Sequence, residues 1–207
     1  MVQGLLAGGM SAMAKAVEGA EDSKELAIKD LKDINLTKND FVIGMAASGR
    51  TPYAVSGVEY ANSIGCNTGC ITTSPNSQIA ATAKLPIEAI TGAEPITGST
   101  RMKSGTAQKM VCNMISTASM IKMGKVYQNL LIDLQPTNEK LVKRAQQIIV
   151  QAANVSNEVA DRELKKYKSV KKTIVAIKTG LDNIEEVDKL LKEARGNISV
   201  ALKLGGK

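Results

Sequence analysis

Short apolar runs alternate with helical patterns between residues 40 and 100. Residues 41–45, 68–73 and 85–90 are apolar runs with β-branched members. Pro52 stands in the first turn of a predicted helix, and Gly65 stands at its end. Strand, helix and strand at this spacing require crossover connections, so the pattern predicts a parallel sheet.

A long helix is predicted next, from about residue 103 to residue 123. An apolar stripe runs along it and includes Met110, Met114, Thr117 and Ile121. We interpret its methionines as core filling rather than a cofactor site, and the same helix is also a candidate for an interface with a second copy. Further helical patterns follow at about 138–153, 156–167, 170–179 and 183–194, with a short one at the end. We therefore predict a doubly wound α/β domain over residues 1–135 and a small helical subdomain over residues 136–207.

The first 25 residues fit this pattern least. Residues 2–9 are predicted to form the tail of a strand or a loop, and Ser11 is predicted to cap a short helix that carries Glu18, Glu21 and Glu25. A doubly wound sheet ordinarily begins with a strand and a ligand-binding loop. We therefore expect this chain to start in the middle of its fold and to expose a sheet edge there.

Composition narrows the range of functions. The chain has 27 Lys or Arg against 20 Asp or Glu, a formal charge of +7, which suits an anionic ligand. Much of the excess lies in a lysine-rich segment that we interpret as a solvated helix face; it holds Lys165, Lys166, Lys168, Lys171 and Lys172. Aromatic residues make up 2% of the chain, which leaves too few for base stacking, and we expect no nucleic-acid partner.

Histidine is missing from the sequence, which removes mechanisms that use imidazole as a base or metal ligand. Cys66 and Cys70 have a C-x3-C spacing, but without histidine we expect no metal site there, and we interpret Cys70 as a small buried residue. Three cysteines without a disulfide framework indicate a reducing, cytoplasmic setting. Because no apolar run reaches about 18 residues, we expect no contact with a membrane.

The segment 46–52 is the strongest candidate for ligand binding. It lies between a predicted strand and a predicted helix, where open α/β sheets bind ligands and where the helix amino end suits a phosphate. Gly49 lets the backbone approach, and Ser48 and Thr51 add hydroxyl groups. The alternative interpretation is an ordinary turn with a helix cap.

Two other segments carry candidate chemistry. Residues 97–106 again concentrate hydroxyls, glycines and cations at a helix start, with a capped polar surface as the equal alternative. Glu18 and Glu21 stand three residues apart, and two crowded carboxylates can raise one pKa toward neutrality. The alternative for these glutamates is a solvated helix end.

Five stretches of the chain closely resemble one family. Residues 2–9, 16–22, 46–53, 97–109 and 124–127 resemble, in order, the N-acetylmuramic acid 6-phosphate etherases, which belong to the sugar isomerase (SIS) phosphosugar-binding superfamily. The resemblance covers essentially the whole chain. It implies an SIS-type sheet and a carbon–oxygen lyase that cleaves the D-lactyl ether of N-acetylmuramic acid 6-phosphate, giving N-acetylglucosamine 6-phosphate and D-lactate in cell-wall sugar recycling.

The resemblance also implies a mechanism and its residues. Elimination follows removal of the proton at C2 and is completed by hydration, without a metal or organic cofactor. Glu21 matches the family's base, Ser48, Gly49 and Thr51 match the phosphate loop, and Ser99, Thr100 and Lys103 match a substrate-lining segment. Members of the family are typically homodimers.

This chain departs from the family in one respect. Family members carry an upstream strand, loop and helix that supply a second phosphate contact and the general-acid glutamate. We therefore expect the 207 residues alone to bind phosphosugar weakly and to turn over slowly. The competing interpretation is a phosphosugar-binding regulatory module without catalysis, since SIS domains also occur in regulators such as the animal glucokinase regulatory protein.

Overall fold

The chain folds as two compact units, each with its own core. The structure, a computed structural model, describes residues 2–206. The two units meet between Asn113 and Met114, inside helix α4 (Lys103–Lys122). The domain boundary predicted between residues 135 and 136 stays a prediction, and each unit is described by itself below.

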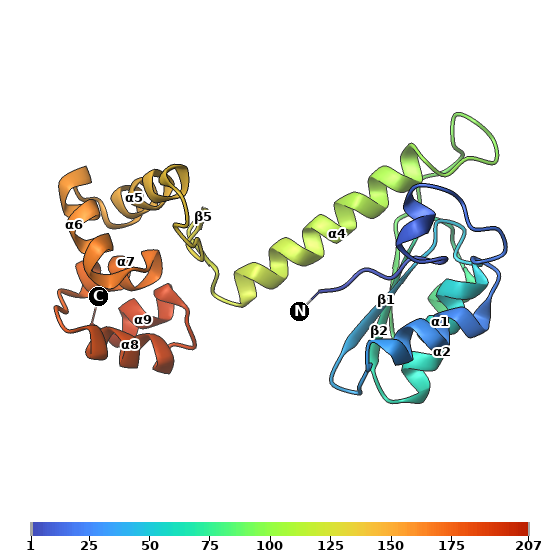
Figure 1. Cartoon of the computed structure of the whole chain (residues 1–207), viewed down its shortest axis with the longest axis horizontal. Helices are drawn as coiled ribbons and strands as arrows, with labels where there is room; N and C mark the ends of the chain where they lie inside the picture. The colour runs from blue at the N-terminus through green and yellow to red at the C-terminus, as the bar shows by residue number, and fades with distance from the viewer. Residues whose placement is uncertain (1, 207) are drawn as a thin grey trace. The chain divides into compact units, whose positions relative to one another are not determined.

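The first unit contains the predicted parallel sheet. Strands β1 (Phe41–Met45), β2 (Asn67–Thr72) and β3 (Leu85–Glu88) pair in parallel in the order β1-β2-β3, with Met45 opposite Ile71 and Ile71 opposite Ile87. Helices α2 (Pro52–Ser63) and α3 (Gln78–Thr82) make the two crossovers (Figure 1). The α/β fold class and all three predicted strands are confirmed.

Helices α2 and α3 pack closely on one face of this sheet. A Cβ atom added to Gly44 would lie 2.6 Å from side-chain atoms of both Val58 and Ile79, so a glycine on β1 is what allows the helices to approach. Val58, Ile79 and Cys70 are fully buried in this core, which confirms the prediction for Cys70. Burial also raises the pKa of the Cys70 thiol.

The opposite face of the sheet is less covered. Alternation along β1 turns Phe41, Ile43 and Met45 away from α2, and these side chains are 51%, 38% and 45% exposed. Cys112 of α4 approaches Met45, with 3.7 Å between the two sulfur atoms. Within residues 2–206, β1 pairs with β2 alone and is an edge strand, as expected from the sequence.

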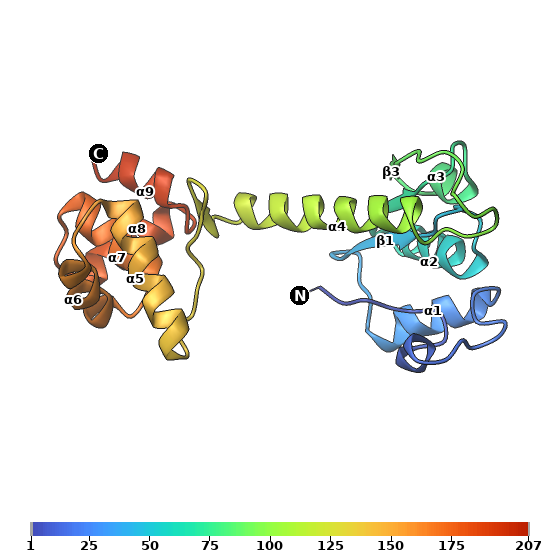
Figure 2. The same cartoon turned by 90° about the horizontal axis from the view of Figure 1, so that it is seen from above.

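The prediction for the first 25 residues is wrong in two respects, because Ser11 lies inside a short helix instead of capping one, and Glu18 and Glu21 are not helical. Glu18 and Glu21 lie in turns, between a short 3-10 helix (Met10–Met13) and helix α1 (Lys24–Asp33). Gly19 has a left-handed φ of 72°, which no continuous right-handed helix accommodates. The helix instead begins after Ser23, whose hydroxyl accepts the N–H of Leu26 at 3.1 Å, and α1 packs beside α2 (Figure 2).

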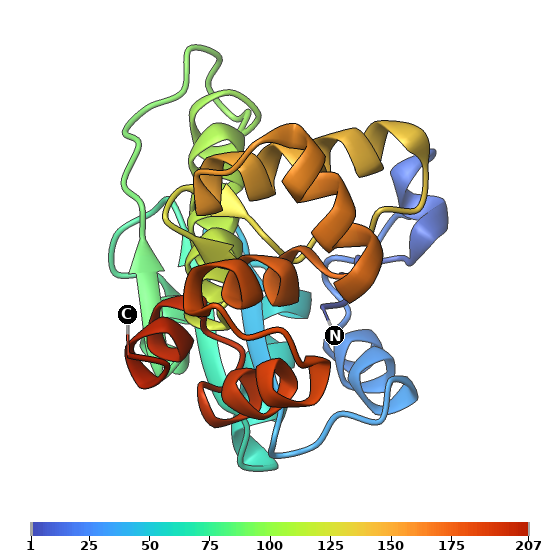
Figure 3. The ribbon, with the colours of Figure 1, turned by 90° about the vertical axis from the view of Figure 1, so that its left-hand side faces the viewer.

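The second unit is a helical bundle entered through a small hairpin. Strands β4 (Val126–Tyr127) and β5 (Leu130–Leu131) pair antiparallel after Gly124. Five helices follow, as the sequence predicts: α5 (Glu139–Ala153), α6 (Asn157–Tyr167), α7 (Val170–Thr179), α8 (Ile184–Glu193) and α9 (Ile198–Leu204). They appear gold to red in Figure 3 and enclose one core, whose fully buried members include Ile149, Ile174, Val175 and Ile198.

Side-chain caps explain where these five helices begin. The residue before each helix accepts a main-chain N–H of the first turn, which satisfies one donor that the helix leaves unpaired. The capping residues are Asn138, Ser156, Ser169, Asn183 and Asn197. Each stands at the break between two helical patterns in the sequence, so the boundaries follow from local chemistry.

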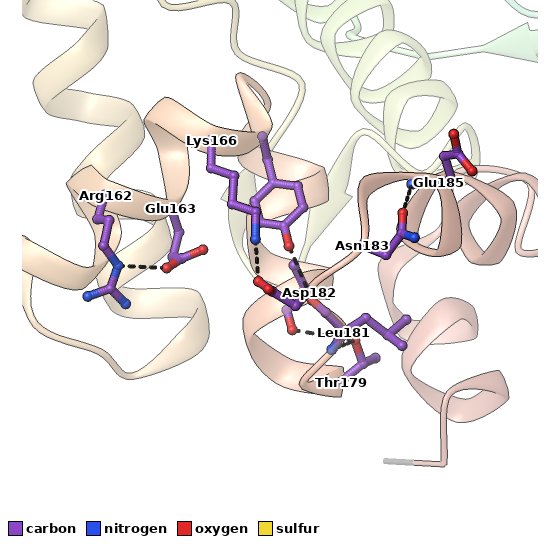
Figure 4. Close-up of polar contacts among 10 residues, drawn as sticks. Arg162, Glu163, Lys166, Thr179, Leu181, Asp182, Asn183 and Glu185 are labelled. Carbon is purple, nitrogen blue, oxygen red and sulfur yellow. Dashed lines mark hydrogen bonds and ion pairs between the residues drawn. The ribbon is translucent and has the colours of Figure 1, made fainter.

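The lysine-rich segment is a solvated surface, as predicted. Lys165 pairs with Asp161 at 2.6 Å, and Lys172 pairs with Asp188 at 2.6 Å. Lys166 pairs with Asp182 beside the hydrogen bond from the Tyr167 hydroxyl to the Leu181 carbonyl (Figure 4). These ion pairs are exposed and contribute little to stability individually.

The stripe on α4 is not core filling, and that prediction is wrong. Met110, Met114 and Ile121 are 55%, 58% and 51% exposed, and Thr117 is exposed as well. The helix is anchored near its start instead, where Ser104 and Val111 are buried.

No helix within residues 2–206 is long and apolar enough to cross a membrane.

Candidate functional site

The loop after β1 is tied to the end of β2. The N–H of Ala46 donates to the carbonyl of Ile71 at 3.2 Å, which carries the parallel pairing one residue beyond the strand. The Ala47 carbonyl then accepts the N–H of Thr73 and three hydroxyl groups, all at 3.1 Å; the hydroxyls belong to Thr72, Thr73 and Ser74. The loop is therefore held against the end of β2 by the N–H of Ala46 and the carbonyl of Ala47.

Because the Ala47 carbonyl is crowded with donors, hydroxyl and N–H groups near it remain available for a ligand. A carbonyl oxygen offers two lone pairs, so the four donors around Ala47 compete for two acceptor positions. In a trans peptide the N–H points opposite to the carbonyl, so the N–H of Ser48 faces away from the end of β2. Within the described residues, the N–H groups of Ser48 and Thr51 have no hydrogen-bond acceptor.

Gly49 is the residue that the loop geometry requires. Its φ is 63°, in the left-handed region, and its carbonyl accepts the N–H of Ile79 at 3.0 Å. A Cβ atom at this position would collide with the side chain of Ser77 and would lie 2.8 Å from the Thr72 hydroxyl oxygen. The loop can lie against the start of α3 because this residue has no side chain.

Helix α2 presents its amino end to this loop. Thr51 is the N-cap residue and makes no side-chain capping bond within the described residues, while Pro52 occupies the first turn. The Ser48 hydroxyl accepts the N–H of Arg50 at 3.3 Å. Hydroxyl groups, free N–H groups and the positive end of the helix dipole are the features that bind phosphate.

A pocket of about 270 Å³ opens beside the loop. Its lining comes from the loops after β1 and β2, from the segment before α4 and from the first turn of α4, and comprises Ala47, Ser48, Thr73, Ser74, Thr91, Gly92, Ala93, Glu94, Thr97, Gly98, Ser99, Thr100 and Ser104. Hydroxyl groups dominate this lining. Of the residues predicted from the sequence, the pocket brings together Ser48, Ser99 and Thr100.

The start of α4 forms one wall of the pocket and is capped from outside the helix. The carboxylate of Glu94 accepts the N–H of Lys103 at 3.1 Å and the N–H of Ser104 at 3.0 Å. These main-chain N–H groups hold the pKa of Glu94 below its usual value, so the carboxylate is ionised at neutral pH. The ammonium of Lys103 donates to the carbonyl of Ala93 at 2.8 Å.

Buried hydroxyls connect this wall to the phosphate-type loop. Thr73 and Ser104 are 7% and 4% exposed, and their hydroxyl oxygens lie 2.8 Å apart. Thr73 also reaches the Ala47 carbonyl, while Ser104 lies 3.5 Å from the hydroxyl of Thr91. The two candidate segments of the sequence are thus parts of one connected site.

Glu21 lies beside the same helix end but outside the pocket lining. Its carbonyl accepts the N–H of Tyr53 at 2.9 Å, two residues after Thr51. The side chain of Glu21 is exposed. The nearby Tyr53 hydroxyl donates to Asp30 of α1 at 2.7 Å, which fixes α1 and the turn before it against α2.

Thr73, Ser74, Glu94 and Ser104 are pocket residues that were not predicted individually. The Ser-Pro-Asn stretch after the second predicted strand was a usable signal, because carboxyl ends of neighbouring parallel strands meet at one edge of the sheet. No local pattern singles out Glu94, since its partners lie nine and ten residues later. Within residues 2–206, no group of three or more His, Cys, Asp or Glu is placed to hold a metal ion.

Comparison with known proteins found one matching family model and a set of relatives that share one name. A model of the glucokinase regulatory protein N-terminal SIS domain matches residues 1–62. An N-acetylmuramic acid 6-phosphate etherase of Bacillus cereus (strain AH820) is 56% identical over 203 residues, which are 98% of this chain and 69% of that protein. The protein of the same name from Bacillus anthracis (strain CDC 684 / NRRL 3495) is 55% identical over the same shares of the two chains.

Proposed function

This chain belongs to the N-acetylmuramic acid 6-phosphate etherase family, and we propose that it cleaves the D-lactyl ether of N-acetylmuramic acid 6-phosphate. The products are N-acetylglucosamine 6-phosphate and D-lactate, and the step is carbon–oxygen bond elimination followed by addition of water. The observation that carries this proposal is the identity of 55–56% over 98% of the chain, together with a hydroxyl-lined pocket beside the loop that leads into α2.

The phosphate binds at the loop 46–51 in this proposal. Ser48 and Thr51 supply free N–H groups there, and Gly49 allows the backbone to reach the ligand. Ser99 and Thr100 line the sugar side of the pocket, and the main-chain N–H of Lys103 donates to Glu94, which also lines it. Binding the phosphate away from the reacting carbons positions C2 and C3 of the sugar.

Glu21 is the base that removes the proton from C2. The neighbouring carbonyl of the opened sugar acidifies this proton, so a carboxylate is a sufficient base. The lone pair left on C2 forms the double bond to C3 as the lactyl oxygen departs with the C3–O electrons and gains a proton. Glu21 suits the role because its main chain is held at the first turn of α2 while its side chain is exposed.

Solvent exchange at C2 tests the proposal directly. N-acetylglucosamine 6-phosphate incubated with the 207-residue chain in D2O should gain deuterium at C2, and the muramic substrate should release D-lactate. Glu21→Gln should lower both rates at least about 100-fold while phosphosugar binding is kept. Glu18→Gln is the matched control, because it removes the same charge from the same turn region. Exchange by Glu21→Gln at the unaltered rate would exclude Glu21 as the base.

A regulatory module that binds phosphosugar without turnover is the second candidate. The match of residues 1–62 to the glucokinase regulatory protein SIS domain favours it. Calorimetry with N-acetylglucosamine 6-phosphate beside a lactate assay separates the two functions. Saturable binding without lactate release or C2 exchange would favour the regulator.

We also propose that the protein acts in the cytoplasm as a homodimer. Free Cys66, Cys70 and Cys112 suit a reducing compartment. The exposed Met110, Met114 and Ile121 on α4 form an apolar stripe suited to contact with a second copy. Light scattering after size-exclusion chromatography should give twice the chain mass of 21.9 kDa, and the single-chain mass would exclude the dimer.

A further inference from the structure

Glu94 places a negative charge in a pocket that is otherwise suited to an anion. It comes from the segment between β3 and α4, and its side chain lines the pocket together with Ser48 and Ser104. Both carboxylate oxygens accept N–H groups of α4, at 3.0 and 3.1 Å. The carboxylate therefore occupies the amino end of α4 that a phosphate would otherwise use.

The start of α2, which follows the loop that carries Ser48, and the start of α4, which carries Ser104, are consequently different in charge. At α2, the N–H groups of Ser48 and Thr51 lack acceptors within residues 2–206, and the dipole end is uncompensated by a nearby side-chain cap. At α4, the dipole end is already compensated by an ionised side chain. A phosphate group is attracted to the first helix start and repelled at the second.

Glu94 also keeps acceptor capacity for a ligand. An ionised carboxylate has about four lone-pair positions, and α4 takes two of them. Ligand groups that can use the remaining positions are hydrogen-bond donors, such as a sugar hydroxyl or an amide N–H. Charge-assisted hydrogen bonds of this kind are shorter and stronger than those between neutral groups.

We propose that Glu94 is a specificity-determining residue, which orients a sugar phosphate with its phosphate at the loop 46–51 and a hydroxyl or amide N–H donating to Glu94. This inference rests on the proposed function, since it takes the pocket to be the phosphosugar site. It extends that function by assigning the phosphate to the loop 46–51 and a donor group of the sugar to Glu94. The pocket then favours phosphorylated sugars with free donor groups over small anions.

Paired binding measurements test the orientation. Inorganic phosphate and N-acetylglucosamine 6-phosphate are titrated into the full chain by NMR, which measures weak affinities. Glu94→Gln keeps the side-chain volume and one oxygen but loses the charge. It should weaken sugar-phosphate binding at least about tenfold, while phosphate binds equally well or more tightly because a like charge has gone.

Two further variants separate recognition from simple support of α4. Glu94→Asp keeps the charge and should recover part of the sugar-phosphate affinity. Glu59→Gln is the matched control, because Glu59 is an exposed carboxylate on α2 outside the pocket lining, and it should leave both affinities unchanged. Thermal unfolding of each variant reports the loss of the α4 cap independently of binding.

The outcomes are distinct from those that test the proposed function. Equal weakening of both ligands by Glu94→Gln would overturn the inference, because it would show support of the fold alone, even if the protein releases lactate. No binding of N-acetylglucosamine 6-phosphate by the unaltered chain would overturn it too. Selective weakening of the sugar phosphate supports it, whether or not lactate is released.

Discussion

Gly49 shows how one residue controls the geometry of the candidate phosphate loop. Two separate constraints act on it, because its φ lies in the left-handed region and a Cβ atom would meet Ser77 and Thr72. A non-glycine residue in left-handed backbone costs about 1–2 kcal/mol before any collision is counted. The loop must shift to relieve the collision, and the free N–H groups at Ser48 and Thr51 shift with it.

Gly49→Ala should therefore weaken phosphosugar binding at least about tenfold and lower the thermal unfolding temperature. Gly57→Ala is the matched control, since Gly57 lies inside α2 and its added Cβ would stand at ordinary contact distances of 3.7 and 3.8 Å. That change should keep binding and stabilise the chain by about 0.5–1 kcal/mol. Unchanged affinity in Gly49→Ala would remove the loop from the binding site.

Tyr53 joins the turn that carries Glu21 to the helix that presents the phosphate loop. Its hydroxyl donates to Asp30, and burial together with this bond raises the pKa of Tyr53 above its usual value. The unfolded chain then loses the phenol proton at lower pH than the folded chain does. The bond's stabilisation is present in full below about pH 10, the ordinary pKa of tyrosine, and falls as the pH rises above it.

Urea unfolding of the unaltered chain and of Tyr53→Phe at pH 8 and pH 11 measures this contribution. The variant should be less stable by about 1.5–3 kcal/mol at pH 8, because the hydroxyl bonds a charged partner. The difference between the two proteins should shrink at pH 11. A difference that stays constant between these pH values would contradict the raised pKa.

Among the elements, β1 is important for the candidate site but lies at an uncovered edge of the sheet. It carries the candidate loop at its end, yet it is an edge strand within residues 2–206, and it exposes Phe41, Ile43 and Met45. Apolar edge strands are templates for pairing with another chain, and natural proteins often protect them with lysine. The chain should therefore self-associate as its concentration rises.

Ile43→Lys tests this prediction at the level of the strand. The charge on the exposed face of β1 should lower light scattering at high protein concentration and leave the far-ultraviolet circular dichroism unchanged. Gln78→Lys adds the same charge to an exposed position on α3 and should leave the scattering as it is. Equal solubilisation by both variants would attribute the effect to net charge instead.

Elements with long or strongly patterned sequences were predictable, and those set by a single residue or by distant contacts were not. The strands of the sheet and helices α5 to α9 follow from apolar runs and from caps such as Asn183 and Asn197. The helix expected around Glu18 failed because Gly19 is left-handed. The role of Glu94 was hidden because it depends on where tertiary structure places the start of α4.

At the scale of the molecule, the net charge is unevenly divided. Residues 1–113 contain ten Lys or Arg and ten Asp or Glu, whereas residues 114–207 contain 17 and ten, so the whole excess of +7 belongs to the second unit. The unit that holds the pocket is neutral. Attraction of a phosphosugar to the pocket therefore depends on local groups, such as N–H groups, hydroxyls, the α2 dipole and Lys103, and not on the net charge of the unit.

The basic second unit should bind polyanions through charge alone. Duplex DNA is the probe, and binding should be weak, independent of base sequence and sensitive to salt, because few aromatic residues exist to stack on bases. If three lysines neutralise phosphates, a fourfold rise in salt lowers the affinity about 40-fold. Replacing Lys189 and Lys192 on α8 by glutamate should weaken DNA binding more than the same replacement of Lys15 and Lys38 in the first unit. Fluorescence anisotropy measures both effects, and affinity that persists at high salt would indicate a dedicated nucleic-acid site.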